Sequence, residues 1–206
     1  MSRNRRVPTL LTIAVIAIGM NGCATKPPRS LDNICDIFKE KAHWYKAAKS
    51  SEKKWHSPIP VTMAFVYQES RFQAKAKPPR EKILWVIPGP RPSSAYGYSQ
   101  AKDDTWDWYR RDSGHGKADR NDFDDAIDFI GWYNAQSHDR NGIANNDAYH
   151  LYLAYHEGHG GFERRSFKND RALQVIAREV SSRSIRYAKQ LSECRRVLEK
   201  PWWRLF

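Results

Sequence analysis

The longest periodic stretch of this sequence, residues 170–199, repeats apolar residues at helical spacing. These residues are Leu173, Ile176, Ala177, Val180, Tyr187, Leu191, Cys194 and Leu198. The spacing places them on one face, which predicts a long amphipathic helix with a buried stripe. Cys194 falls on the buried face of this helix.

Several other segments also have helical spacing. We expect one helix over residues 31–49, one that begins at Pro58 and Pro60, and three more over residues 102–111, 122–137 and 146–157. Proline is tolerated in the first turn of a helix. Aspartates, which suit helix N-termini, lie near the starts of the last three helices. They are Asp104, Asp122, Asp124, Asp125 and Asp147.

A Pro-rich stretch over residues 76–93 excludes a continuous helix. Its prolines are Pro78, Pro79, Pro88, Pro90 and Pro92. The apolar run Ile83–Ile87 inside it is compatible with a short strand. Because no internal repeat or second domain is evident, the sequence predicts one compact all-α domain over residues 31–199 with a Pro-rich insertion.

The first 22 residues have the organisation of an export signal. Three arginines are followed by an apolar run from Leu10 to Met20. As a helix this run reaches only about 16 Å, whereas the hydrocarbon core of a bilayer is about 30 Å thick. A basic start, a short apolar run and small residues together indicate a cleaved secretory signal.

The end of that segment, Met20-Asn21-Gly22-Cys23, resembles a bacterial lipobox, in which signal peptidase cuts before a cysteine that is then acylated. The resemblance implies a signal peptide over residues 1–22, lipidation of Cys23 and a tether over residues 23–30. Because Ala24 follows the cysteine, it also implies the periplasmic face of the outer membrane of a Gram-negative bacterium. The alternative is an ordinary signal or anchor in which Cys23 is incidental.

Three cysteines are an odd number for an exported protein. If Cys23 carries lipid, Cys35 and Cys194 remain as a pair in an oxidising compartment. A bridge between them would tie the first helix to the last and stabilise the fold by roughly 5 kcal/mol in the chain-entropy treatment. The alternative is two buried free thiols.

The chain is basic, with 35 Lys and Arg against 23 Asp and Glu and a net charge of +12. Loss of the three signal-segment arginines lowers this charge to +9. The balance favours an anionic partner, either membrane or cell wall. Nucleic acid is not expected, because the chain is exported and its basic residues are dispersed without an RNA or DNA motif.

Glu69 is the leading catalytic candidate. It lies at the end of an apolar helix, just before the Pro-rich insertion, with Phe65, Tyr67 and Phe72 nearby in sequence. A carboxyl among aromatic side chains is disfavoured as an anion, so its pKa rises and it stays protonated near neutrality, as a general acid must.

Three motifs occur in order: Gln68-Glu69-Ser70-Arg71-Phe72, then Ala95-Tyr96-Gly97-Tyr98-Ser99-Gln100, then Ala154-Tyr155-His156-Glu157-Gly158-His159-Gly160. They resemble the signatures of the soluble lytic transglycosylase domain, a member of the lysozyme-like superfamily. Residues 126–133, which include Tyr133, are similar to an internal helix of that family. The resemblance covers about residues 55–162, which implies a lysozyme-like core with added terminal helices.

The resemblance implies cleavage of the β-1,4 bond between N-acetylmuramic acid and N-acetylglucosamine in peptidoglycan strands, with no cofactor and no metal. One Glu protonates the departing oxygen and then acts as base, while the muramoyl 6-hydroxyl closes on C1 to give a 1,6-anhydro end. Glu69 would take both roles. A second carboxylate, which hydrolytic glycosidases need, is not required, because the hydroxyl is already held in proximity.

The same resemblance assigns substrate contacts. They are Gln100, Gly97, Tyr98, Ser99, Tyr155, His156, Glu157 and Tyr133. Gly97 would let the backbone approach the sugar, and the Tyr155 hydroxyl would point toward Glu69 or the adjoining sugar. Two departures from the family alter the groove: Tyr98-Ser99 replaces Leu-Met, and His156-Glu157 replaces Asn-Ala.

Glu157 leaves an alternative open, because a second carboxylate that activates water would make the protein a hydrolase of the same bond. It is otherwise a helix-end residue paired with a neighbouring Arg or His. A third possibility is a non-catalytic wall-binding lipoprotein. The sequence from His156 to His159 lacks the H-E-x-x-H spacing of a zinc site, and Gly158 is expected to end the helix.

Two aromatic features complete the expectations. Tyr96 and Tyr98 are placed to line a sugar groove. For the aromatic tail, residues 200–206, we expect one of three roles: packing on the domain, contact with glycan, or a place at the membrane interface.

The Pro-rich insertion lies between Glu69 and Gln100, where it can close one end of the groove. The sequence leaves the oligomeric state open.

Overall fold

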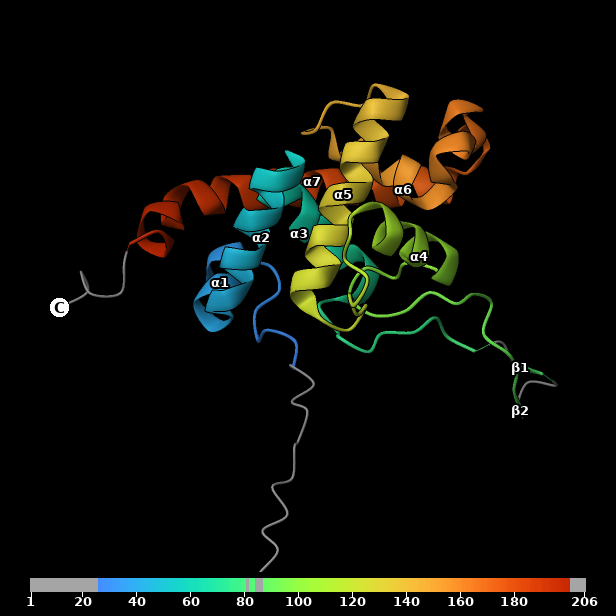
Figure 1. Ribbon diagram of the computed structural model, residues 1–206, viewed down its shortest axis with the longest axis horizontal. Helices are drawn as coiled ribbons and strands as arrows, with labels where there is room; N and C mark the ends of the chain where they lie inside the picture. Colours follow the sequence, from blue (N-terminus) through green and yellow to red (C-terminus); the bar gives the residue numbers. More distant parts are fainter. Residues whose placement is uncertain (1–25, 81, 84–86, 201–206) are drawn as a thin grey trace, which may run out of the picture.

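The computed structural model describes residues 26–80, 82–83 and 87–200, and the secondary structure of this part of the chain is mainly helical (Figure 1). The all-α prediction is confirmed. The elements are α1 (Ile34–Glu40), α2 (Ala42–Trp55), α3 (Ile59–Ser70), β1 (Lys82–Ile83), β2 (Ile87–Pro88), α4 (Asp103–Asp112), α5 (Phe123–Asn141), α6 (Ala148–Glu163), the 3₁₀ turn η1 (Ser166–Asn169) and α7 (Arg171–Leu198).

Helix α3 forms the centre of the fold. Every residue from Ile59 to Tyr67 is buried, as expected for a helix that is apolar on all sides. It packs against α2, α5 and α7, and α6 packs against α5 and α7. The buried stripe of α7 includes Leu173, Ala177, Val180, Tyr187 and Leu191, which confirms the predicted amphipathic helix.

The predicted helix over residues 31–49 is wrong in its extent, because two helices occupy residues 34–55. Lys41 interrupts them with φ −118° and ψ 65°. The break lets each helix pack against a different partner, α1 against α7 and α2 against α5. Helix α1 begins at the cap Asn33, whose side chain accepts hydrogen bonds from the N–H groups of Cys35 and Asp36.

Two of the five aspartates predicted near helix starts, Asp122 and Asp147, cap their helices, whereas α4 has no side-chain cap. Asp122 accepts from the N–H of Asp124 at 2.8 Å and begins α5. Asp147 accepts from the N–H of His150 at 3.1 Å and begins α6. These carboxylates satisfy N–H groups that have no partner within the helix.

The Pro-rich insertion forms an antiparallel hairpin that projects away from the helices (Figure 1). Ile83 pairs with Ile87, so the expected single strand over Ile83–Ile87 is wrong: the two residues lie on opposite strands of the hairpin. At the base of the hairpin, Arg80 Nη1 donates to the Gly89 carbonyl at 3.4 Å, and Arg91 donates to the Pro78 carbonyl.

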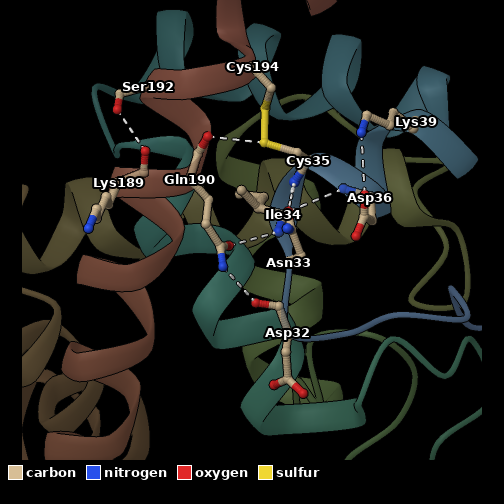
Figure 2. Close-up of a disulfide and its surroundings, with 10 residues drawn as sticks. All are labelled: Asp32, Asn33, Ile34, Cys35, Asp36, Lys39, Lys189, Gln190, Ser192 and Cys194. Carbon is tan, nitrogen blue, oxygen red and sulfur yellow. Dashed lines mark hydrogen bonds and ion pairs between the residues drawn. A yellow bond between two sulfur atoms is a disulfide. The ribbon is translucent and has the colours of Figure 1, made fainter.

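A disulfide joins Cys35 to Cys194 with an S–S distance of 2.05 Å, as predicted (Figure 2). Gln190 reinforces the connection, because it accepts from the Ile34 N–H at 3.0 Å and donates to the Asp32 carbonyl at 3.1 Å. The chain just before and within α1 is therefore held to α7 by hydrogen bonds as well as by the covalent bridge.

The predicted signal peptide, Cys23, the first residues of the tether and residues 201–206 of the tail lie outside the described residues. Among the described residues, no helix is both long and apolar enough to cross a membrane.

Candidate active site

Glu69 is the next-to-last residue of α3 and lines a cleft of about 450 Å³. Helix α3 ends at Arg71, which has a left-handed backbone conformation with φ 52°. The other walls come from the loop before α4 and from α4, α5 and α6. The cleft brings together six of the predicted site residues: Glu69, Gln100, Tyr133, Tyr155, His156 and Glu157.

The Glu69 carboxyl is half-buried, and loss of water raises its pKa from 4.5 to about 7. A hydrogen bond from the Tyr152 hydroxyl acts in the opposite direction and lowers this pKa. Burial therefore outweighs the hydrogen bond. The carboxyl is therefore protonated below neutral pH and about half protonated at pH 7, and the protonated form is the one that a general acid needs.

Of the three aromatic side chains expected around Glu69, Tyr67 and Phe72 lie elsewhere. Tyr67 lies against two arginines on another side of α3, and Phe72 stacks on Trp44 in the core. Phe65, the third expected residue, lies one helical turn before Glu69 and packs edge-on against Tyr152 and Tyr155, with ring centroids 5.2 and 5.4 Å apart. The low-polarity environment thus comes from the packing of α3 against α6.

The Tyr155 hydroxyl, expected to point toward Glu69 or the adjoining sugar, has a backbone partner instead of Glu69. The hydroxyl donates to the Ser99 carbonyl at 2.6 Å and ties α6 to the loop before α4. Burial, followed by the nearby Glu69 charge, holds the pKa of Tyr155 well above its ordinary range. The tyrosine bonded to Glu69 is Tyr152, one helical turn earlier, on the same face of α6.

The loop before α4 contributes Gln100 to the cleft. Its side-chain nitrogen donates to the carbonyls of Ala76 at 3.0 Å and Gly97 at 2.9 Å. Gly97 itself does not line the cleft. Its φ is +77°, and a Cβ there would lie 2.0 Å from the Arg120 carbonyl oxygen. The glycine is therefore required by contact with the protein's own backbone, not by approach of a sugar.

Tyr98 and Ser99 are also absent from the cleft surface, contrary to expectation. Both are fully buried. The Tyr98 ring packs edge-on against Trp44 and Phe123, so it belongs to the core. Ser99 contributes its carbonyl, which accepts from Tyr155. Tyr96 is half-buried and lines a neighbouring pocket rather than the cleft.

A kink at Gly158 shapes the rim of the cleft. Gly158 has φ 74° and ψ 157° inside α6, and the helix resumes beyond it as far as Glu163. The helical run that begins at Ala148 therefore ends at Gly158, as expected, and a second helical run follows it. His156, exposed, and Glu157, half-buried, face the cleft just before the kink. Glu157 accepts a hydrogen bond from the Ser166 hydroxyl.

The three histidines of this region have separate partners, and His156 Nδ1 lies 3.5 Å from a carboxylate oxygen of Glu157. His159 is buried, stacks on the Tyr133 ring at 4.5 Å and lies 3.0 Å from the Ser137 hydroxyl. His150 pairs with the capping Asp147 at 2.7 Å. Within the described ranges no three Asp, Glu, His or Cys side chains form a group that could hold a metal ion.

Seven residues that line the cleft were not predicted from the sequence. They are Pro78, Ala95, Ala101, Lys102, Thr105, Phe129 and Gly158. Tyr152, which forms a hydrogen bond with Glu69 but does not line the cleft, was also missed. The periodicity of α6 could have identified it, because Tyr152 and Tyr155 are three residues apart and share a face.

A family model described as the transglycosylase SLT domain matches residues 11–194. No curated protein and no solved structure matches the chain. The match extends beyond the three motifs at both ends and includes α1, α2 and nearly all of α7. The chain therefore belongs to the transglycosylase SLT domain family, whose members are transglycosylase-type enzymes with peptidoglycan as substrate.

Proposed function

We propose that this protein is a lytic transglycosylase that cleaves the β-1,4 bond between N-acetylmuramic acid and N-acetylglucosamine and leaves 1,6-anhydro ends. The proposal rests on one observation above all: Glu69 lies half-buried in a cleft, in the family's catalytic motif, with its pKa raised to about 7. A carboxyl with that pKa holds a proton in about half of the molecules at neutral pH and can release it to a leaving group.

In the first step the Glu69 carboxyl gives its proton to the glycosidic oxygen as the bond from that oxygen to muramoyl C1 breaks. In the second step the resulting Glu69 carboxylate takes the proton of the muramoyl 6-hydroxyl as its oxygen bonds to C1. The proton on Glu69 is thereby restored, and no water is consumed. Because the nucleophile belongs to the substrate, its proximity replaces a positioned water and a second carboxylate.

Gln100, Tyr155 and Tyr133 would position the glycan. Both donor bonds of the Gln100 amide go to backbone carbonyls, so the group that it offers to a sugar hydroxyl or amide is its oxygen. Tyr133 presents a ring to the cleft while its hydroxyl donates to the Ala154 carbonyl at 3.4 Å. Aromatic faces of this kind suit the apolar face of a sugar ring.

We further propose that the chain is exported and held by lipid on Cys23 at the periplasmic face of the outer membrane. The support is the order of basic residues, short apolar run, Gly22 and Cys23. A net charge of +9 after loss of the signal segment would favour retention between an anionic membrane and an anionic wall.

A hydrolase of the same bond is the second candidate, and one observation favours it: Glu157 lines the same cleft as Glu69. As a base, Glu157 would activate water against C1 and give a reducing end. Its hydrogen bond from Ser166 and its proximity to His156 Nδ1, at 3.5 Å, are compatible with a structural role at the kink.

Digestion of purified peptidoglycan by the full chain in detergent, followed by mass spectrometry of the products, distinguishes these functions. Anhydro products that disappear with Glu69→Gln and persist with Glu157→Gln support the transglycosylase. Reducing ends that disappear with either variant select the hydrolase. Binding to the wall without release of products, in wild type as in Glu69→Gln, would leave a non-catalytic wall-binding protein.

A further inference from the structure

A second pocket, the side pocket, opens beside the cleft with a volume of about 340 Å³. Ala95 lines both spaces. Adjacent residues are also divided between them: Pro78 and Lys102 face the cleft, and their neighbours Lys77 and Asp103 face the side pocket. The cleft and the side pocket therefore adjoin each other at Ala95.

The side pocket is positively charged. Its carboxylate, Asp103, forms an ion pair with Arg120 at 2.7 Å, so these two charges offset each other. Lys77 and Arg91 remain as excess positive charge. The Lys77 ammonium lies 5.2 Å from the centre of the Tyr96 ring. Arg91 donates one N–H to the Pro78 carbonyl, and a guanidinium carries five such donors, so it retains others for a ligand.

Two serine hydroxyls add neutral donors to this charge. Ser93 Oγ accepts from the N–H of Ala95 at 3.3 Å, and Ser94 Oγ accepts from the N–H of Asp103 at 3.1 Å. Each hydroxyl acts as acceptor in these bonds and keeps its own hydrogen to donate. Two cations and two hydroxyl donors around one pocket match the acceptor oxygens of a carboxylate.

We propose that the side pocket binds a carboxylate of the peptide attached to the muramoyl sugar, and that it makes the enzyme selective for peptide-bearing glycan. This inference rests on the proposed function. The lactyl carboxyl of the sugar is consumed in the amide bond to the peptide, so the carboxylates lie in the peptide. Lys77 and Arg91 come from the two ends of the Pro-rich insertion, which gives that insertion a role in substrate choice.

The test compares initial rates on glycan strands that carry peptides with rates on strands stripped of peptides by an amidase, using the full chain in detergent. Lys77→Gln/Arg91→Gln is expected to lower the ratio of the two rates by about tenfold, because each exposed charged contact contributes a factor of a few. Lys46→Gln/Lys53→Gln removes the same charge from the exposed surface of α2 and should leave the ratio unchanged.

An unchanged ratio in Lys77→Gln/Arg91→Gln, or an equal fall in both double variants, overturns the inference. If wild type releases no product from either substrate, the proposed function fails instead. The side pocket is then judged by binding of a soluble disaccharide-peptide and of the peptide-free disaccharide to the Glu69→Gln protein. Tighter binding of the peptide form that is lost with Lys77→Gln/Arg91→Gln supports the inference, and equal affinities refute it.

Discussion

Two depressions flank the last turn of α3 and differ in chemistry more than in size. The cleft beside Glu69 has about 450 Å³, and a groove between α3 and α7 has about 380 Å³. We call the second the arginine groove, because its lining includes Arg71, Arg178, Arg183 and Arg186 against one carboxylate, Glu179. The cleft instead contains a carboxyl surrounded by aromatic side chains.

The two sites differ in how far their charged groups are removed from water. In the arginine groove, Arg71 and Arg183 lie over the Tyr67 ring, with Cζ 4.2 and 3.2 Å from its centre, and Arg183 also pairs with Asp32 at 2.9 Å. The arginine charges there are stabilised by the Tyr67 ring, by Asp32 and by water. At Glu69 the aromatic contacts of α3 with α6 remove water, and the pKa rises to about 7. The arginine groove is comparable in size but has no such desolvated acid, so it lacks the proton donor that the proposed cleavage needs.

The largest effect is expected for Glu69→Gln. Glutamine cannot donate and retrieve the proton, so release of anhydro products from peptidoglycan should fall by at least about 1,000-fold. Arg178→Gln/Arg186→Gln, which alters the arginine groove, should change the rate by less than about threefold. Product release is measured by chromatography and mass spectrometry. Comparable losses in both proteins would contradict the assignment of catalysis to the cleft.

Loss of the disulfide should affect stability without changing the cleft. Cys35→Ser/Cys194→Ser removes the bridge between α1 and α7, which we expect to lower the free energy of unfolding by about 2–5 kcal/mol. The double variant should still fold, because Gln190 keeps its bonds to Ile34 and Asp32. Denaturant unfolding measures the change. Product ratios altered at a temperature where the variant is folded would contradict the separation of the two regions.

The raised pKa of Glu69 also predicts a pH-dependent stability difference. Its folded-state pKa of about 7 exceeds the unfolded value of 4.5, so the folded protein binds the proton more tightly. This stabilisation is complete below pH 4.5 and is lost as the pH rises through 7. Glu69→Gln should therefore be more stable than wild type at pH 8 by up to about 3 kcal/mol, and the difference should shrink toward pH 5. Unfolding curves at both pH values test this.

Much of the fold could be predicted because helices leave local signals. The stripe of α7 and the capping aspartates Asp122 and Asp147 are readable from spacing alone. The break at Lys41 was not, because residues 31–49 keep a helical period across it and tertiary packing decides where the chain turns. The hairpin pairing of Ile83 with Ile87 was missed because an apolar run gives no sign of reversal.

The candidate site was predictable where a side chain reaches the cleft from a motif, as for Glu69 and Gln100. It was not predictable where a motif residue supports the backbone. Gly97 accommodates Arg120, and Tyr98 fills the core. A motif marks the positions that build a site, but only packing reveals which of them face the substrate and which lie beneath it.

The smallest effect, and the sharpest probe of the cleft, is expected for Tyr152→Phe. The Tyr152 hydroxyl lowers the pKa of Glu69 by bonding to its carboxylate, so its removal should raise that pKa further above 7. Activity requires protonated Glu69 and falls as the pH rises through this value. The alkaline limb of the kcat/KM profile should therefore move to higher pH by about 0.7 unit, the equivalent of one hydrogen bond of about 1 kcal/mol.

Tyr187→Phe is the matched control, because it removes a buried hydroxyl that donates to the Leu31 carbonyl on the α7 side of the molecule. It should lower stability and leave the alkaline limb in place. A limb that stays fixed in Tyr152→Phe, or moves to lower pH, would mean that the hydroxyl does not stabilise the carboxylate. Burial by Phe65, Tyr152 and Tyr155 would then be sufficient to explain the raised pKa of Glu69. The difference between the cleft and the arginine groove would in that case come from loss of water, with no hydrogen bond acting against it.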